Sequence, residues 1–176
     1  TKQIKKTHPV TIEAVVMIIS TMINKFSQDQ QHQIFIKLVQ LIKNHSETTW
    51  HSTTKAIEAI ITIHQKSKLR LEDNHKKELL DAFLLTSYDS NLTQLSLKGM
   101  QDVLSLAKNP SFIERVKENI QQAQPNVKAE VVIKTKGQLL QAVPYDIQFI
   151  KDVMNKSFAP FLQDPIRDVR IIASNT

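Results

Sequence analysis

Signals that begin a helix recur along this chain at nearly constant spacing. They fall near Pro9, Thr49, Ser90, Val127 and Pro165, which are separated by 40, 41, 37 and 38 residues. Most of these starts carry a proline or a short polar side chain, which the first turn of a helix favours. Units of two helices recur with periods near 40 residues in helical-repeat proteins. The spacing therefore predicts antiparallel helix pairs within one domain that spans residues 1–176.

Apolar side chains recur at helical spacing between these starts and predict an all-α fold of about nine helices. Ser27 and Gln30 have the spacing of a capping box, and Asn109 precedes Pro110 as a cap precedes the first helical residue. We also expect caps at Asp73 or Asn74, at Asn91 and at Asp164. The predicted helices cover residues 9–26, 28–44, 49–67, 73–87, 91–108, 110–124, 126–143 and 145–162, and a last one begins at 165.

The chain has only two glycines, Gly99 and Gly137. This scarcity argues against folds that depend on tight turns and phosphate-binding loops. Both glycines fall inside predicted helices, where glycine costs about 1 kcal/mol relative to alanine. Ala59 lies 40 residues before Gly99, and Ala173 lies 36 after Gly137. We interpret this recurring small residue as a place where paired helices approach closely.

Residues 127–136 are rich in β-branched side chains and could instead form a strand. The repeat spacing favours a helix here, because a lone strand would lack a pairing partner. A two-stranded ribbon with residues 167–173 is the alternative that the sequence leaves open.

Cysteine is absent, which excludes disulfides and thiolate chemistry and suits a reducing compartment. No signal peptide is recognisable, and the longest apolar stretch, residues 10–23, is short of the roughly 20 residues that span a bilayer. We therefore expect an intracellular location, cytoplasmic or nuclear, without a membrane span. The chain lacks an initiating methionine, and its last helix is short, so we also expect a piece of a longer protein.

No residue pattern predicts a catalytic centre, a metal site or a cofactor. None of the six histidines has a zinc-ligand spacing, and no nucleophile elbow or glycine-rich loop is present. We expect a protein that is not an enzyme.

Positive charge is concentrated in the N-terminal part of the chain. Residues 1–77 hold 12 Lys and Arg against 6 Asp and Glu, whereas residues 78–176 hold 11 of each. One hypothesis is therefore a nucleic-acid or phosphate-binding domain that uses this basic half. Its candidate residues are Lys66, Lys68, Arg70, Lys76 and Lys77.

One segment carries a family resemblance. Leu162, Asp164, Pro165, Val169, Arg170 and Ala173 form a Leu-x-Asp-Pro-x-x-x-Val-Arg-x-x-Ala pattern that resembles the second helix of a HEAT repeat. Similarity to HEAT and armadillo proteins implies a right-handed superhelix of helix pairs. It also implies a concave surface, lined by the second helices, that binds another protein. The hypothesis that follows is a non-enzymatic scaffold or adaptor whose partner is unknown. The residues implied for this surface are Lys55, Glu58, Gln94, Lys98, Gln101, Lys134, Gln138 and Gln141.

Overall fold

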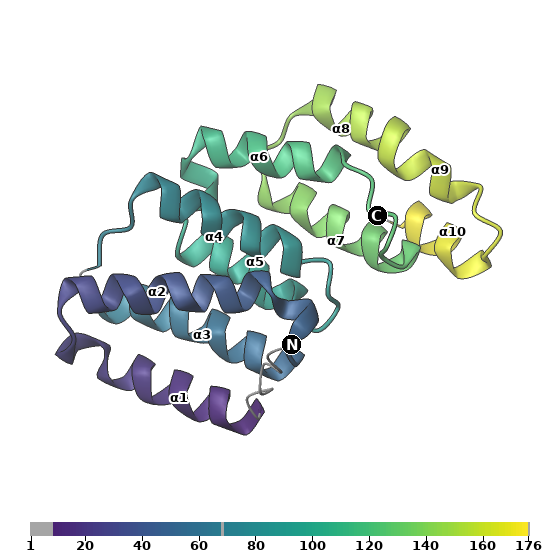
Figure 1. Ribbon diagram of the computed structural model, residues 1–176. Coiled ribbons are helices and arrows are strands. Elements are labelled where there is room, and N and C mark those ends of the chain that lie inside the picture. The colour runs from purple at the N-terminus through teal and green to yellow at the C-terminus, as the bar shows by residue number, and fades with distance from the viewer. Residues whose placement is uncertain (1–8, 68, 176) are drawn as a thin grey trace, which may run out of the picture.

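The computed structural model describes residues 9–67 and 69–175, with the side chains of residues 9–13 and 20 excepted. The described chain is all helical and contains no strand (Figure 1). Its α-helices are α1 (Pro9–Met22), α2 (Gln28–Lys43), α3 (Trp50–Lys66), α4 (Asp73–Thr86), α5 (Thr93–Asp102), α6 (Pro110–Gln121), α7 (Ala129–Ala142), α8 (Ile147–Val153), α9 (Ala159–Leu162) and α10 (Arg167–Ser174). A π-helical turn, Met154–Phe158, joins α8 to α9. With α8 to α9 taken as one helix, the described residues form nine helices, as the sequence predicts.

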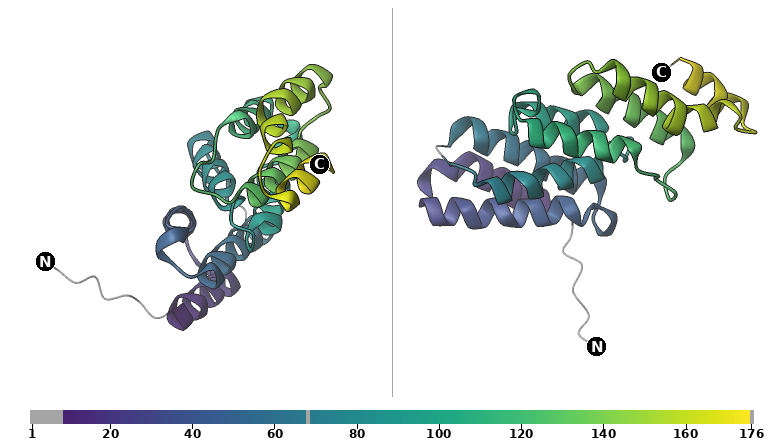
Figure 2. Two further views of the ribbon diagram at one scale, coloured as in Figure 1. Left: turned by 90° about the vertical axis from the view of Figure 1, so that its right-hand side faces the viewer. Right: turned by 90° about the horizontal axis from the view of Figure 1, so that it is seen from above.

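Helix contacts follow a regular order along the chain. α1, α3, α5, α7 and α10 contact one another in sequence, and α2, α4 and α6 do the same. Each member of the second group also packs on the helix that follows it, so α2 contacts α3, α4 contacts α5 and α6 contacts α7. Figure 2 shows the same succession of helices from the side and from above. The core lies between the two groups and is made largely of isoleucine, leucine, valine and phenylalanine.

Two predicted helix starts are confirmed atom by atom. The Ser27 hydroxyl accepts from the Gln30 N–H while the Gln30 side chain accepts from the Ser27 N–H, which is a capping box. Asn109 Oδ1 accepts from the N–H groups of Ser111 and Phe112, with Pro110 as the first helical residue.

The start of α4 at Asp73 agrees with the predicted helix over 73–87, but three predicted caps are wrong. Asp73 is the first residue of α4 and not its cap, because Glu72 holds the cap position. Asn91 belongs to a turn in which its N–H donates to Asp89 Oδ1, so α5 begins only at Thr93. The last helix begins at Arg167 and not at Pro165, because the Asp164 carboxylate accepts from the Ile166 N–H and closes a short turn first.

Residues 127–136 are not a strand. α7 begins at Ala129, and this helix buries Val132, Ile133 and Leu139. The β-branched side chains fit a helix here because tertiary burial outweighs their modest intrinsic preference for strands.

The helix predicted over 91–108 ends early, at Asp102. Ser105 then adopts a left-handed conformation, with φ 49°, the only positive φ outside glycine among the described residues. This conformation costs free energy in a non-glycine residue. The turn places Leu104 and Leu106 in the core, where they are 4% and 1% exposed. Burial of two leucines therefore accounts for a break that local sequence does not signal.

The small-residue prediction is confirmed in detail at Gly99. A Cβ built on Gly99 would lie 2.4 Å from Cζ of Phe83, which is fully buried on the paired helix α4. The other small residues are also buried: Ala59 on α3, Gly137 on α7 and Ala173 on α10.

Ion pairs connect α2, α4, α6 and the start of α8. Lys43 pairs with Glu78 at 3.7 Å, and Arg115 Nε pairs with Asp81 at 3.0 Å. Lys117 pairs with Asp146, the cap of α8, at 3.0 Å. The first two pairs are exposed, so each contributes little alone, whereas the Lys117 side chain of the third pair is only 17% exposed. Arg170 does not extend them, since its guanidinium donates to the carbonyls of Asp164 and Pro165 in its own turn.

We expect Gly99→Ala to lower the free energy of unfolding by about 1–3 kcal/mol, because the added methyl group overpacks the core. Helix propensity alone predicts the opposite sign, a gain of about 1 kcal/mol. Urea unfolding measures the difference, and Lys98→Ala on the exposed side of α5 is the control. In a Phe83→Leu background the cost of Gly99→Ala should shrink. A stabilising Gly99→Ala would contradict the close contact.

We expect part of the acid sensitivity of this protein to come from Asp146. The Phe149 N–H and the Lys117 ammonium lower the pKa of Asp146 below its ordinary value of 3.8. The ionised carboxylate therefore stabilises the fold above that value, and the contribution is lost as pH falls through the lowered pKa. Asp146→Asn keeps a capping side chain but no charge, so its stability should fall less between pH 4 and pH 2 in urea titrations. Parallel pH profiles would contradict this assignment.

Candidate functional site

A groove that several candidate residues line lies between the first turn of α5 and residues 130–138 of α7. Its volume is about 690 Å³. Gln94, Lys134 and Gln138 line it, so the structure brings together three of the residues implied for a binding surface. The connections that precede α5 and α7 complete the walls through Asp89 and Lys128.

A buried hydroxyl network holds the two walls in place. The Ser87 carbonyl accepts from Thr93 Oγ1 at 2.8 Å and from Thr135 Oγ1 at 3.1 Å. Thr86 Oγ1 lies 2.7 Å from Ser96 Oγ. These contacts tie the end of α4 to both α5 and α7, so buried hydrogen bonds join the elements on which the groove is built.

Tyr88 separates this groove from a second one of about 620 Å³ on the side of α4 and α6. Its hydroxyl donates to Asn119 Oδ1 at 3.0 Å. Burial raises the pKa of Tyr88 well above its ordinary value, so the phenol is a neutral donor at physiological pH. Tyr88 therefore acts as a fixed wall between the two grooves.

Charges of both signs line the groove between α5 and α7. Lys128 and Lys134 are balanced by Asp89 and Glu130, and Gln94 and Gln138 add neutral amides. A mixture of this kind can form hydrogen bonds to a polypeptide, whereas a polyanion would meet two carboxylates.

The other candidate residues of this surface lie outside the groove. Lys55 and Glu58 form an ion pair of 2.8 Å on α3, with each side chain nearly half exposed. Lys98, Gln101 and Gln141 are exposed on α5 and α7.

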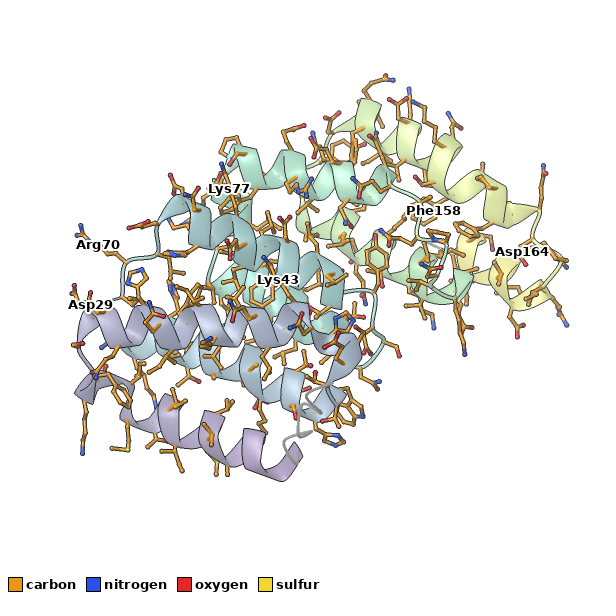
Figure 3. The ribbon with its side chains drawn as sticks, in the orientation of Figure 1. Asp29, Lys43, Arg70, Lys77, Phe158 and Asp164 are labelled. Atoms are coloured by element: carbon orange, nitrogen blue, oxygen red, sulfur yellow. The ribbon has the colours of Figure 1, made fainter. Side chains whose placement is uncertain are left out.

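The phosphate-binding candidates are dispersed around the connection from α3 to α4. Figure 3 places Arg70 on this connection and Lys77 on α4. Lys66 is exposed, Lys76 pairs with Asp73 at 3.3 Å, and Lys77 lines a small cavity with Asp81 and Arg115. Lys68 lies outside the described residues.

The described residues contain no cluster of three or more His, Cys, Asp or Glu side chains that could hold a metal ion. His32 and His75 stack between α2 and α4 with ring centroids 5.0 Å apart. None of the described helices is both long and apolar enough to cross a membrane.

Comparisons with protein-family models, with curated proteins and with solved structures find no match to this chain.

Sequence reasoning missed Tyr88, Thr135 and Lys136. Thr135 and Lys136 lie among apolar residues that recur at helical spacing. That spacing was the available sign that both side chains are buried. Lys136 follows Val132 by four residues and precedes Leu139 by three, so a helix must place all three on one side.

We expect Thr135→Val to lower the free energy of unfolding by about 1 kcal/mol, because it removes one hydrogen bond between α7 and the Ser87 carbonyl. The matched control is Thr62→Val, whose hydroxyl bonds only to Glu58 within α3. The control should change stability by less than about 0.5 kcal/mol. Equal effects in urea unfolding would show that the network does not join the helices.

Proposed function

We propose that this chain is a protein–protein interaction module, a non-enzymatic scaffold built as a right-handed α-solenoid of HEAT- or armadillo-like helix pairs. The order of contacts supports the repeat, since α1, α3, α5, α7 and α10 each contact the next. Buried small residues at Ala59, Gly99, Gly137 and Ala173 recur with the same period.

The observation that carries the binding role is the groove between α5 and α7. It combines Gln94, Lys134 and Gln138 on walls that buried hydrogen bonds hold together. Fixed walls lower the entropic cost of binding, because few groups must be ordered when the partner arrives. Mixed charge and exposed amides suit a polypeptide surface.

The competing function is phosphate or nucleic-acid binding. Its support is the exposure of Lys66, Arg70 and Lys77 near the connection from α3 to α4. Against it, Asp73 and Asp81 lie among these cations.

The test is affinity capture with three matched baits, followed by quantitative mass spectrometry. The groove variant replaces Gln94, Lys134 and Gln138 by alanine, and the control variant replaces the exposed Gln148, Lys151 and Gln163 by alanine. We expect a protein that wild type and control retain but that the groove variant loses by about tenfold or more, which corresponds to 1.4 kcal/mol.

Nuclease treatment and a salt series separate the two functions. Retention of a protein partner should survive nuclease and change little between 50 and about 200 mM salt. Phosphate contacts predict a steep loss over that range, about tenfold or more even for a few contacts. Capture of nucleic acid alone, or equal loss in both variants, would reject the scaffold.

A further inference from the structure

A separate cavity lies between the end of α6, the first turns of α7 and the segment from the π-helical turn to α9. These helices form the C-terminal side of the molecule in Figure 1. The volume of the cavity is about 380 Å³, which lies in the size range of small-molecule sites. Val132, Pro160 and Phe161 supply apolar wall, and Lys136, Lys156 and Ser157 supply polar groups.

Lys136 is the unusual member of this cavity. Its side chain is buried, with 4% of the residue exposed. Its ammonium donates to the Gln122 carbonyl at the end of α6, at 2.9 Å. None of the ion pairs among the described residues includes Lys136. Burial lowers the pKa of Lys136, as expected for a cation that has lost water without gaining a carboxylate.

An ammonium group has three N–H donors, and the structure shows one acceptor for them. A buried cation that lacks a counter-charge is costly. An anion that enters the cavity would supply both the charge and the missing acceptors. The Lys136 ammonium lies at the C-terminal end of α6, where the helix dipole favours a cation. The Gln122 carbonyl that accepts its hydrogen bond carries no formal charge, however, so the ammonium still lacks a counter-charge.

The opposite wall is shaped by Pro160. Proline lacks the N–H that would bond to the Lys156 carbonyl in a regular α-helix, and its ring would collide with that carbonyl. The chain widens here into the π-helical turn, in which the Ala159 N–H donates to the Met154 carbonyl. This widened turn carries Lys156 and Ser157, both of which line the cavity. Turns of this type occur often at binding sites.

We propose that this cavity, the Lys136 cavity, binds a small organic carboxylate with an apolar body. The carboxylate accepts hydrogen bonds from the Lys136 ammonium, and the exposed Lys156 adds positive charge at the cavity. The apolar body lies against Val132, Pro160 and Phe161. A bare phosphate fits less well, because it would leave this apolar wall uncovered and would need more donors than one buried ammonium provides.

The first test uses hexanoate as the probe and wild-type protein. Titration followed by two-dimensional NMR should give saturable shifts of backbone amides concentrated around Val132, Lys136 and Ser157. Hexanol lacks the charge and inorganic phosphate lacks the apolar body, so each should bind at least about tenfold more weakly than hexanoate. Shifts scattered over the surface, or phosphate binding as tight as hexanoate binding, would overturn the proposal.

Lys136→Met removes the charge and keeps the length of the side chain. We expect it to weaken hexanoate binding by about tenfold or more while leaving hexanol binding within about twofold. Lys151→Met is the control, because Lys151 is exposed on α8 and lines neither this cavity nor the groove between α5 and α7. It should leave hexanoate binding unchanged. Equal hexanoate affinity in wild type and folded Lys136→Met would contradict the assignment, and the wild-type titration decides the question if that variant does not fold.

Discussion

The close contact between Gly99 and Phe83 determines how the centre of this molecule is assembled. A glycine on α5 lets the Phe83 ring of α4 lie against helix backbone, and both residues are buried. The helices are then near enough for Thr86 and Ser96 to meet at 2.7 Å, and the end of α4 presents the Ser87 carbonyl to Thr93 and Thr135. Close packing at Gly99 thus accompanies the hydrogen bonds that join the walls of the groove.

Much of the fold could be predicted because its local signals agree with one another. The capping box is read from Ser27 and Gln30, three positions apart, and another helix start from the adjacent Asn109 and Pro110. The structure contains both. The break at Ser105 could not be read in this way. Its cause is the burial of Leu104 and Leu106 in the core of the assembled helices, and a serine does not by itself indicate a left-handed conformation. The late start of α10 has a local origin instead, since the Asp164 side chain accepts from the Ile166 N–H and closes a short turn directly before the helix.

The candidate groove could be predicted only in part. Periodicity places Gln94, Lys134 and Gln138 on exposed parts of neighbouring helices, and the groove contains all three. It gives no information about Tyr88, whose role depends on Asn119, 31 residues further along the chain. The surroundings of the basic residues could also be predicted only in part, because Asp73 and Lys76 are three positions apart on one helix, whereas Arg115 meets Asp81 only in the folded chain.

Lys136 supplies a hydrogen bond that the end of α6 requires, and it leaves a buried positive charge without a counter-charge. Its ammonium occupies the C-terminal end of α6, where the carbonyl of Gln122 would otherwise lack a donor. A neutral amide or a hydroxyl could serve that carbonyl at lower cost, because neither would bring a charge into a largely apolar cavity. Lysine also leaves two N–H groups for another acceptor, in a cavity whose far wall is a π-helical turn beside Pro160. Helix capping explains the hydrogen bond to Gln122, whereas the charge and the open volume beside it are accounted for by an anion.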